Sequence, residues 1–153
     1  RYLLVNDFDE GTTKEFLEAQ GFNDKERAMA WHFCGGKPGY LVELANTRRS
    51  SGAIAEKAER MREEEISRLV FLLARNKEKK GAILDILASF APVDGIQYTD
   101  SMDLDVLSFL VRHNLLFLDP VKRTIKPQSR LNLLAIRAVI RQSNVEREQT
   151  SSF

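Results

Sequence analysis

The segment that most constrains this chain is a glycine pair followed by a proline, Gly35-Gly36-Lys37-Pro38, which joins two amphipathic stretches. Paired glycines permit backbone conformations that are closed to other residues. Proline cannot continue a helix, but its fixed φ angle suits the first turn of a new one. The sequence therefore predicts a helix end, a tight turn and a new helix from about Pro38. A plain helix connector is one interpretation; a turn close to a ligand or neighbouring domain is the other.

Composition bounds the class of protein. The chain has 153 residues, of which 43% are hydrophobic and 29% charged, enough for one good core or two small ones. Its 23 basic and 22 acidic residues leave a formal charge of +1, so no global field attracts nucleic acid or membrane. The single cysteine excludes an internal disulfide and suits a cytoplasmic location. No apolar run is long enough for a membrane span, and we expect no membrane partner.

The first third of the chain predicts three short helices. The sequence Thr12-Thr13-Lys14-Glu15 fits a capping box for a helix that ends near Gln20. Asn23 or Asp24 caps a second helix that ends near Cys34, and the third runs from Pro38 to about Asn46. Residues 2–5 form a strand-like run for which no partner is evident nearby.

The remainder predicts a winged helix-turn-helix. Helices are expected over about 53–76, 82–90 and 102–113, from apolar stripes at helical spacing. Two strand-like runs, 115–118 and 124–126, flank a turn that begins at Asp119-Pro120, which is typical of a β-hairpin. A last helix over about 129–142 completes the order. The predicted fold class is therefore mainly α, with a small helical bundle followed by a winged helix-turn-helix that has one β-hairpin wing.

A family resemblance rests on the order of these features. A helix with Phe16-Leu17, a second helix and then Gly-Gly-Lys-Pro-Gly-Tyr-Leu at 35–41 resembles the lid of AAA+ ATPases of the STAND class, in particular the archaeal-type group. The resemblance implies the C-terminal part of a P-loop ATPase that acts as a nucleotide-dependent switch and interaction module. The implied domains are an orphan strand and loop (1–11), a lid (12–47), a hinge (48–52), a winged helix (53–142) and a flexible tail (143–153).

The same resemblance implies a cofactor and a partner. ATP or ADP would bind to the full-length parent, mainly through an N-terminal P-loop domain of the same protein. Gly35, Gly36 and Pro38 would line the adenine side of that nucleotide. No cofactor is expected for this chain alone.

The groups that carry out catalysis are missing from the sequence. It contains no G-x-x-x-x-G-K-[ST] phosphate loop to hold the phosphates of a nucleotide. His32, His113 and Cys34 lie in unrelated segments without the spacing of metal ligands. We therefore expect no catalytic residue, no metal site and no activity from this chain alone, while the parent protein is expected to be an ATPase.

Local charge suggests a second function. Lys122, Arg123, Lys126 and Arg130 are candidates for contact with nucleic acid or a protein partner, in a segment (119–142) of net charge +5. The alternative is thus a winged-helix DNA-binding transcription regulator with an N-terminal helical dimerisation or ligand module. DNA binding is the less favoured of the two, because the helix expected in the groove lies in a segment, 98–114, of net charge −2. A third possibility is an adaptor that self-associates through 53–65 and 2–5.

Overall fold

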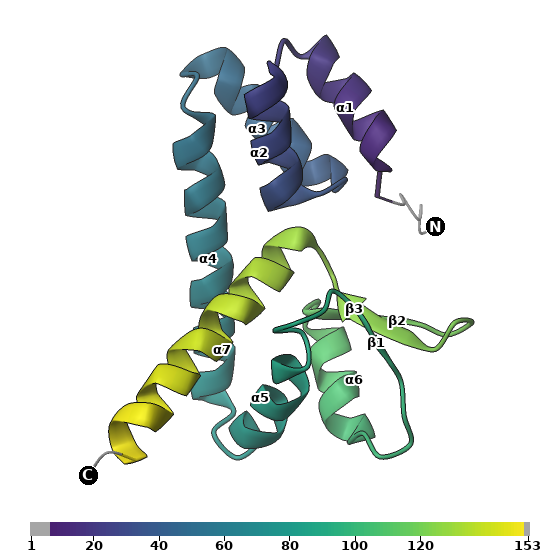
Figure 1. Ribbon diagram of the computed structural model, residues 1–153, viewed down its shortest axis with the longest axis vertical. Coiled ribbons are helices and arrows are strands. Elements are labelled where there is room, and N and C mark those ends of the chain that lie inside the picture. Colours follow the sequence, from purple (N-terminus) through teal and green to yellow (C-terminus); the bar gives the residue numbers. More distant parts are fainter. Residues whose placement is uncertain (1–6, 152–153) are drawn as a thin grey trace. The chain divides into compact units, whose positions relative to one another are not determined.

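The computed structural model describes residues 7–151 (Figure 1). The predicted strand at 2–5 lies outside the described residues. Contacts divide the chain into two compact units. Unit 1 comprises residues 1–62 with 129–131, and unit 2 comprises residues 63–128 with 132–153. Within the described part, no helix is both long and apolar enough for a membrane span.

Unit 1 begins with helix α1, Glu10–Ala19, which starts earlier than the sequence predicts. Asp9 is its N-cap: the side chain accepts a hydrogen bond of 2.7 Å from the backbone N–H of Thr12. That hydrogen bond holds the pKa of the Asp9 carboxyl below its ordinary value. The predicted capping box of Thr12 and Glu15 is wrong, because Asp9 already caps the helix one turn earlier.

Helices α2, Asp24–Cys34, and α3, Pro38–Ser50, follow. Asn23 and Glu26 form a reciprocal capping box, with hydrogen bonds of 2.9 and 2.8 Å to each other's backbone N–H groups. Pro38 occupies the first turn of α3, as predicted. The buried hydrophobic side chains of unit 1 come from its helices, including the starts of α4 and α7, and from the loop after α1: Leu17, Phe22, Ala30, Phe33, Cys34, Leu41, Leu44, Ala45, Ile54, Ala58, Met61 and Leu131.

Helix α3 is longer than predicted and takes in part of the segment expected to be a hinge. The sequence predicts an end near Asn46 and a hinge at 48–52, whereas residues 48–50 are helical. Arg48 pairs with Glu26 at 3.4 Å, and Arg49 donates to Gln20 at 2.6 Å. These contacts with α1 and α2 stabilise a polar last turn that composition alone marks as a loop.

The turn between α2 and α3 is filled by the chain itself. Gly35 and Gly36 are both buried. The N–H of Phe8 donates to the carbonyl of Gly36 at 2.8 Å, and a Cβ atom at Gly36 would lie only 1.8 Å from the Phe8 carbonyl oxygen. Gly35 has φ +56°, and a Cβ atom there would lie 2.7 Å from Cγ of Arg130. Both glycines are therefore required by close approaches of other segments of unit 1.

Cys34, the last residue of α2, is buried beside this turn. Only 1% of its surface is exposed. Burial, with a smaller contribution from the negative charge of Glu43, raises the pKa of its thiol to about 12. Cys34 is thus a small buried apolar group whose thiol stays protonated well above neutral pH.

Unit 2 contains most of α4, Ile54–Arg75, then α5, Lys80–Ala88, and α6, Leu104–Arg112. Its antiparallel sheet has the order β1-β3-β2, with β1 at Ile96–Gln97, β2 at Leu116–Asp119 and β3 at Thr124–Pro127. The β2–β3 hairpin was predicted, whereas β1 was not. Helix α7, Arg130–Ser151, ends the described chain and belongs to unit 2 from Asn132 onward.

Two residues with positive φ mark the turns of unit 2. Asn114, with φ 57°, follows α6, and asparagine adopts this left-handed conformation more readily than most residues. Arg123, with φ 54°, lies in the hairpin turn. Asp119 accepts hydrogen bonds from the N–H groups of Val121, at 2.9 Å, and Lys122, at 3.1 Å. These bonds hold the pKa of the Asp119 carboxyl below its ordinary value.

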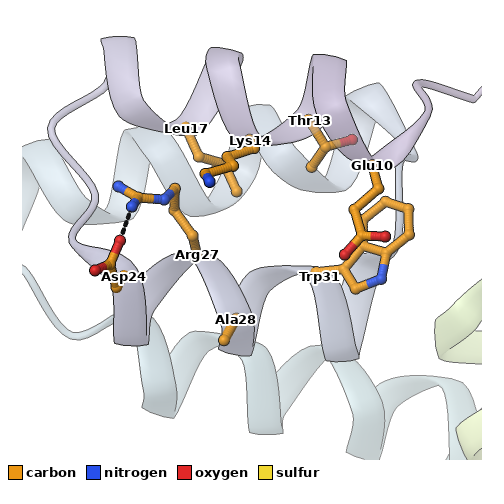
Figure 2. A pocket seen from close by; sticks show the side chains of 8 residues that line it. All are labelled: Glu10, Thr13, Lys14, Leu17, Asp24, Arg27, Ala28 and Trp31. Atoms are coloured by element: carbon orange, nitrogen blue, oxygen red, sulfur yellow. Dashed lines mark hydrogen bonds and ion pairs between the residues drawn. The ribbon is translucent and has the colours of Figure 1, made fainter.

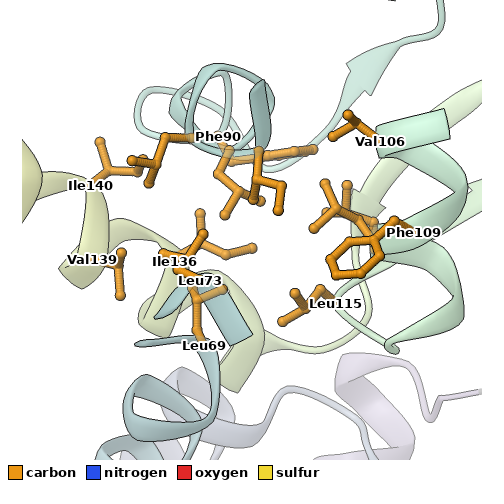
Figure 3. Close-up of a cluster of buried hydrophobic side chains, with 14 of the residues drawn as sticks. Leu69, Leu73, Phe90, Val106, Phe109, Leu115, Ile136, Val139 and Ile140 are labelled. Carbon is orange, nitrogen blue, oxygen red and sulfur yellow. The ribbon is translucent and has the colours of Figure 1, made fainter. Parts of the chain in front are cut away.

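The core of unit 2 lies between its helices and one face of the hairpin (Figure 3). Buried aliphatic and aromatic side chains fill it. Its members come from the helices, from β2 and β3 and from the loops beside them: Leu69, Leu73, Ile83, Leu84, Leu87, Phe90, Val106, Leu107, Phe109, Leu110, Leu115, Leu116, Ile125, Leu133, Ile136, Val139 and Ile140. The predicted fold class is confirmed: mainly helical, with a small bundle followed by a winged-helix-like hairpin.

The C-terminal segment differs from the prediction of a flexible tail at 143–153. Residues 143–151 continue α7 as helix. No glycine or proline interrupts this segment, and Thr150 donates from its hydroxyl to the carbonyl of Glu146 at 3.1 Å. Polar composition indicated solvent exposure correctly, but exposure does not by itself end a helix.

We expect Gly36→Ala to lower the free energy of unfolding by about 1–3 kcal/mol, because the added methyl group overlaps the Phe8 backbone. Gly39→Ala is the matched control: nothing lies within 4 Å of its position in α3, so it should be neutral or stabilise by up to about 1 kcal/mol. Urea unfolding followed by circular dichroism measures both. Equal stabilities of the two variants would contradict the close approach.

The Cys34 thiol predicts a loss of stability at high pH. In the folded state the pKa of the thiol is about 12, against an ordinary value of 9.0. The contribution of the thiol to the free energy of unfolding is therefore complete below pH 9. It declines between pH 9 and 12, because the thiol ionises there in the unfolded chain but not in the folded one. The slope is about 1.4 kcal/mol per pH unit. Unfolding of the wild type and of Cys34→Ala at pH 8, 9, 10 and 11 measures it. The difference between the two proteins should shrink as the pH rises; a constant difference would refute the predicted shift.

Candidate functional site

A groove of about 320 Å³ lies between α1 and α2 of unit 1 (Figure 2). Side chains from both helices project into it, and Lys14 and Leu17 extend from α1 towards α2. The Glu10 carboxyl group lies beside the ring of Trp31 at one end, and Arg27 and Asp24 lie at the other. The lining is completed by Thr13 and Ala28.

The polar groups of the groove differ in whether they have partners. Arg27 is engaged: it donates to the Phe22 carbonyl at 2.6 Å and pairs with Asp24 and with Glu18. The Thr13 hydroxyl is buried and has no hydrogen-bond partner. Buried polar atoms without a partner are uncommon in native proteins and call for an explanation. Toward a ligand, the groove offers the Thr13 hydroxyl and the Lys14 ammonium group as hydrogen-bonding groups.

The α2–α3 turn presents a different surface from the one the sequence predicts. Gly35 and Gly36 are covered, whereas Lys37 and Pro38 are each half-buried. Of the three residues expected on the adenine side of a nucleotide, Pro38 alone retains appreciable surface. The nucleotide contact itself stays a prediction.

The four basic residues predicted to contact a partner fall into two places. Lys122 and Arg123 are exposed in the β2–β3 turn, and Lys126 is exposed on β3 with its ammonium group 5.5 Å from the Phe117 ring. Arg130 belongs to unit 1, where its Nε donates to the His32 carbonyl at 3.5 Å and its aliphatic part covers Gly35. Contact with a partner stays a prediction for all four, and the hairpin brings together only the first three.

Sequence reasoning missed the groove. One sequence feature could have indicated it: Thr13 lies four residues before Leu17, so the two side chains share a helix face. A threonine on a buried face is a candidate for an unsatisfied hydroxyl, but only the packing of α2 shows that it has no partner. Among the residues that the structure describes, no group of three or more His, Cys, Asp or Glu side chains could hold a metal ion.

Comparison with known proteins identifies relatives. Residues 55–140 match a family model described as Uncharacterized ATP-binding protein MJ1010-like, C-terminal domain. The uncharacterized ATP-binding protein PYRAB12000 of Pyrococcus abyssi is 39% identical over 137 residues, which cover 89% of this chain and 41% of that protein. MJ1659 of Methanocaldococcus jannaschii, also named an uncharacterized ATP-binding protein, is 35% identical over 144 residues, 92% of this chain and 39% of its own length. The chain thus spans about two fifths of the curated relatives it matches.

Two solved structures agree with the fold. One is the C-terminal domain of a possible ATP-binding protein from Methanocaldococcus jannaschii, with a TM-score of 0.54, 29% identity and coverage of 58% of this chain and 99% of that chain. The other is the Walker-type ATPase PABY2304 of Pyrococcus abyssi, with a TM-score of 0.59 and 18% identity over 87% of this chain and 43% of that chain; it supports the fold alone. The chain belongs to the family of uncharacterized ATP-binding proteins that are MJ1010-like, and residues 55–140 form its C-terminal domain.

Proposed function

We propose that this chain is the C-terminal regulatory part of an ATP-binding protein of the STAND class, in which it responds to the nucleotide held by a preceding P-loop domain. The observation that carries the proposal is the match of residues 55–140 to a C-terminal-domain model of ATP-binding proteins, together with 39% identity over 89% of this chain to PYRAB12000, which is named an ATP-binding protein. The sequence itself has no phosphate loop, so the phosphates would be held elsewhere. The nucleotide would be ATP or ADP.

The α2–α3 turn is the part proposed to meet the nucleotide. The half-buried ring of Pro38 offers an apolar edge for the adenine base, and Lys37 offers an ammonium group beside it. The hydrogen bond from Phe8 to Gly36 joins this turn to the segment that precedes α1. A displacement of that segment would therefore act directly on the turn, which is a mechanical basis for a nucleotide-dependent switch.

The hairpin is proposed as a second contact surface, for a protein partner with acidic groups. Lys122, Arg123 and Lys126 supply the positive charge, and Val121 at the tip is 89% exposed. Reading of DNA is less favoured, since Asp103 caps α6, Asp105 lies in its first turn, and carboxylates repel phosphate. The names of the relatives point to ATP and not to DNA.

The nucleotide contact is tested in a longer polypeptide in which a phosphate-loop domain precedes this chain. Lys37→Ala and Pro38→Ala should each raise the Kd for ATP about three- to tenfold, the loss of one modest contact. Val42→Ala is the control, because Val42 is exposed on the same helix and is not at the turn. Isothermal titration calorimetry measures all three. Unchanged affinity in both turn variants would remove the turn from the nucleotide site.

A separate experiment tests whether this chain binds ATP without the phosphate-loop domain. The 153-residue chain alone should show no ATP binding tighter than about 1 mM in the same titration, because a few apolar and single-charge contacts leave little net affinity. Tight binding by the isolated chain would mean that it contains a nucleotide site of its own. The groove between α1 and α2 would then be the first place to look, and Lys14→Ala would locate it.

A further inference from the structure

Helix α4 carries an apolar stripe on the side that faces away from its core. Within unit 2, Leu69 and Leu73 of this helix are buried in the core. Val70 and Phe71 are instead 48% and 68% exposed. Ser67 and Ala74, which are also exposed, lie three residues before Val70 and three after Phe71 and so share their face. A phenylalanine this exposed, with an apolar neighbour beside it, is typical of an interaction surface.

The charges at the two ends of the stripe have opposite signs. Glu63, Glu64 and Glu65 precede it, whereas Arg75 and Lys77 follow it. Among the described residues, neither Glu64 nor Lys77 has an ion-pair partner. Glu64 lies seven residues before Phe71, about 10 Å along the helix, and Lys77 lies seven residues after Val70, in the turn that follows Arg75, the last residue of α4. In sequence, the acidic and the basic end are therefore placed symmetrically about the midpoint between Val70 and Phe71.

We propose that this stripe binds the same stripe of a second copy of the chain in an antiparallel, two-fold symmetric pair. A two-fold axis between Val70 and Phe71 places Val70 of one copy opposite Phe71 of the other. It also places Ser67 opposite Ala74, where two small side chains let the helices approach, and Glu64 opposite Lys77. An interface of this kind is self-complementary, because one patch supplies both halves.

Charge selects the direction of the pair. A parallel arrangement would place glutamates of one copy against the same glutamates of the other, which is unfavourable. Antiparallel packing instead places Glu64 of each copy beside Lys77 of the other, which gives two symmetry-related ion pairs. Exposed ion pairs add little affinity, so Phe71 and Val70 supply most of it while the charges fix the orientation.

Sedimentation equilibrium on the 153-residue chain, over about 10–500 µM, tests the association in the range expected of a small interface. The wild type should show a reversible monomer–dimer equilibrium. Phe71→Glu should raise the dimer Kd at least about 30-fold, as loss of a central anchor does. Val145→Glu is the control: it changes an exposed apolar residue on α7, to which no contact is assigned, and should leave the Kd unchanged. A wild type that stays monomeric throughout, or equal effects of the two variants, would overturn the proposal.

Charge reversal tests the register. Glu64→Lys and Lys77→Glu should each weaken the dimer severalfold, and the double variant should restore it, because each pair then regains opposite charges with its signs exchanged. Failure of the double variant to recover would refute the pairing of these two residues. Circular dichroism of each variant confirms that the helical content is unchanged.

Cross-linking tests the direction. A mixture of Ser67→Cys and Ala74→Cys chains should form the mixed disulfide faster than either chain links to itself, because these positions face one another across the axis. The native Cys34 is buried and should stay silent. Faster self-linking of Ser67→Cys would indicate a parallel pair and would overturn the arrangement.

Discussion

The contact between the backbones of Phe8 and Gly36 fixes the segment before α1 against the α2–α3 turn of unit 1. Helices α1 and α3 are separated along the chain by α2, and this hydrogen bond of 2.8 Å joins the start of one to the start of the other. It forms only because Gly36 has no Cβ atom, since any side chain would collide with the Phe8 carbonyl. Gly35 then admits the aliphatic part of Arg130 beside it. The turn is thus a packed junction and not an open loop.

Local chemistry accounts for the parts of the fold that the sequence predicts well. Asn23 with Glu26, Pro38 and Asn114 each act within a few residues, so the start of α2, the start of α3 and the stop after α6 can be predicted without the rest of the chain. The hairpin follows from two strand-like runs on either side of a proline turn. These elements are enough to define the helical class and the order of its parts.

The elements that sequence reasoning missed depend on residues far apart in the chain. Strand β1 has only two residues and exists because Ile96 pairs with Ile125 on β3. The last turn of α3 depends on contacts such as that of Arg49 with Gln20, which lies 29 residues earlier. The same holds for the site: two glycines show that something approaches, but only the structure identifies Phe8 as the segment that does so. The unsatisfied Thr13 hydroxyl equally depends on how α2 packs.

A turn filled by its own chain changes what the lid resemblance means physically. An open glycine turn would adapt to a bound nucleotide by moving its own backbone. The backbone of this turn is less free to move, because Gly36 and Phe8 are in close contact and a shift of Gly36 requires a shift of Phe8. A ligand at Pro38 would therefore push on the segment before α1 as well as on α3. If the proposed nucleotide contact forms at Pro38, the rigid glycines would make it a sensor, because a displacement of Pro38 would also displace the segment before α1.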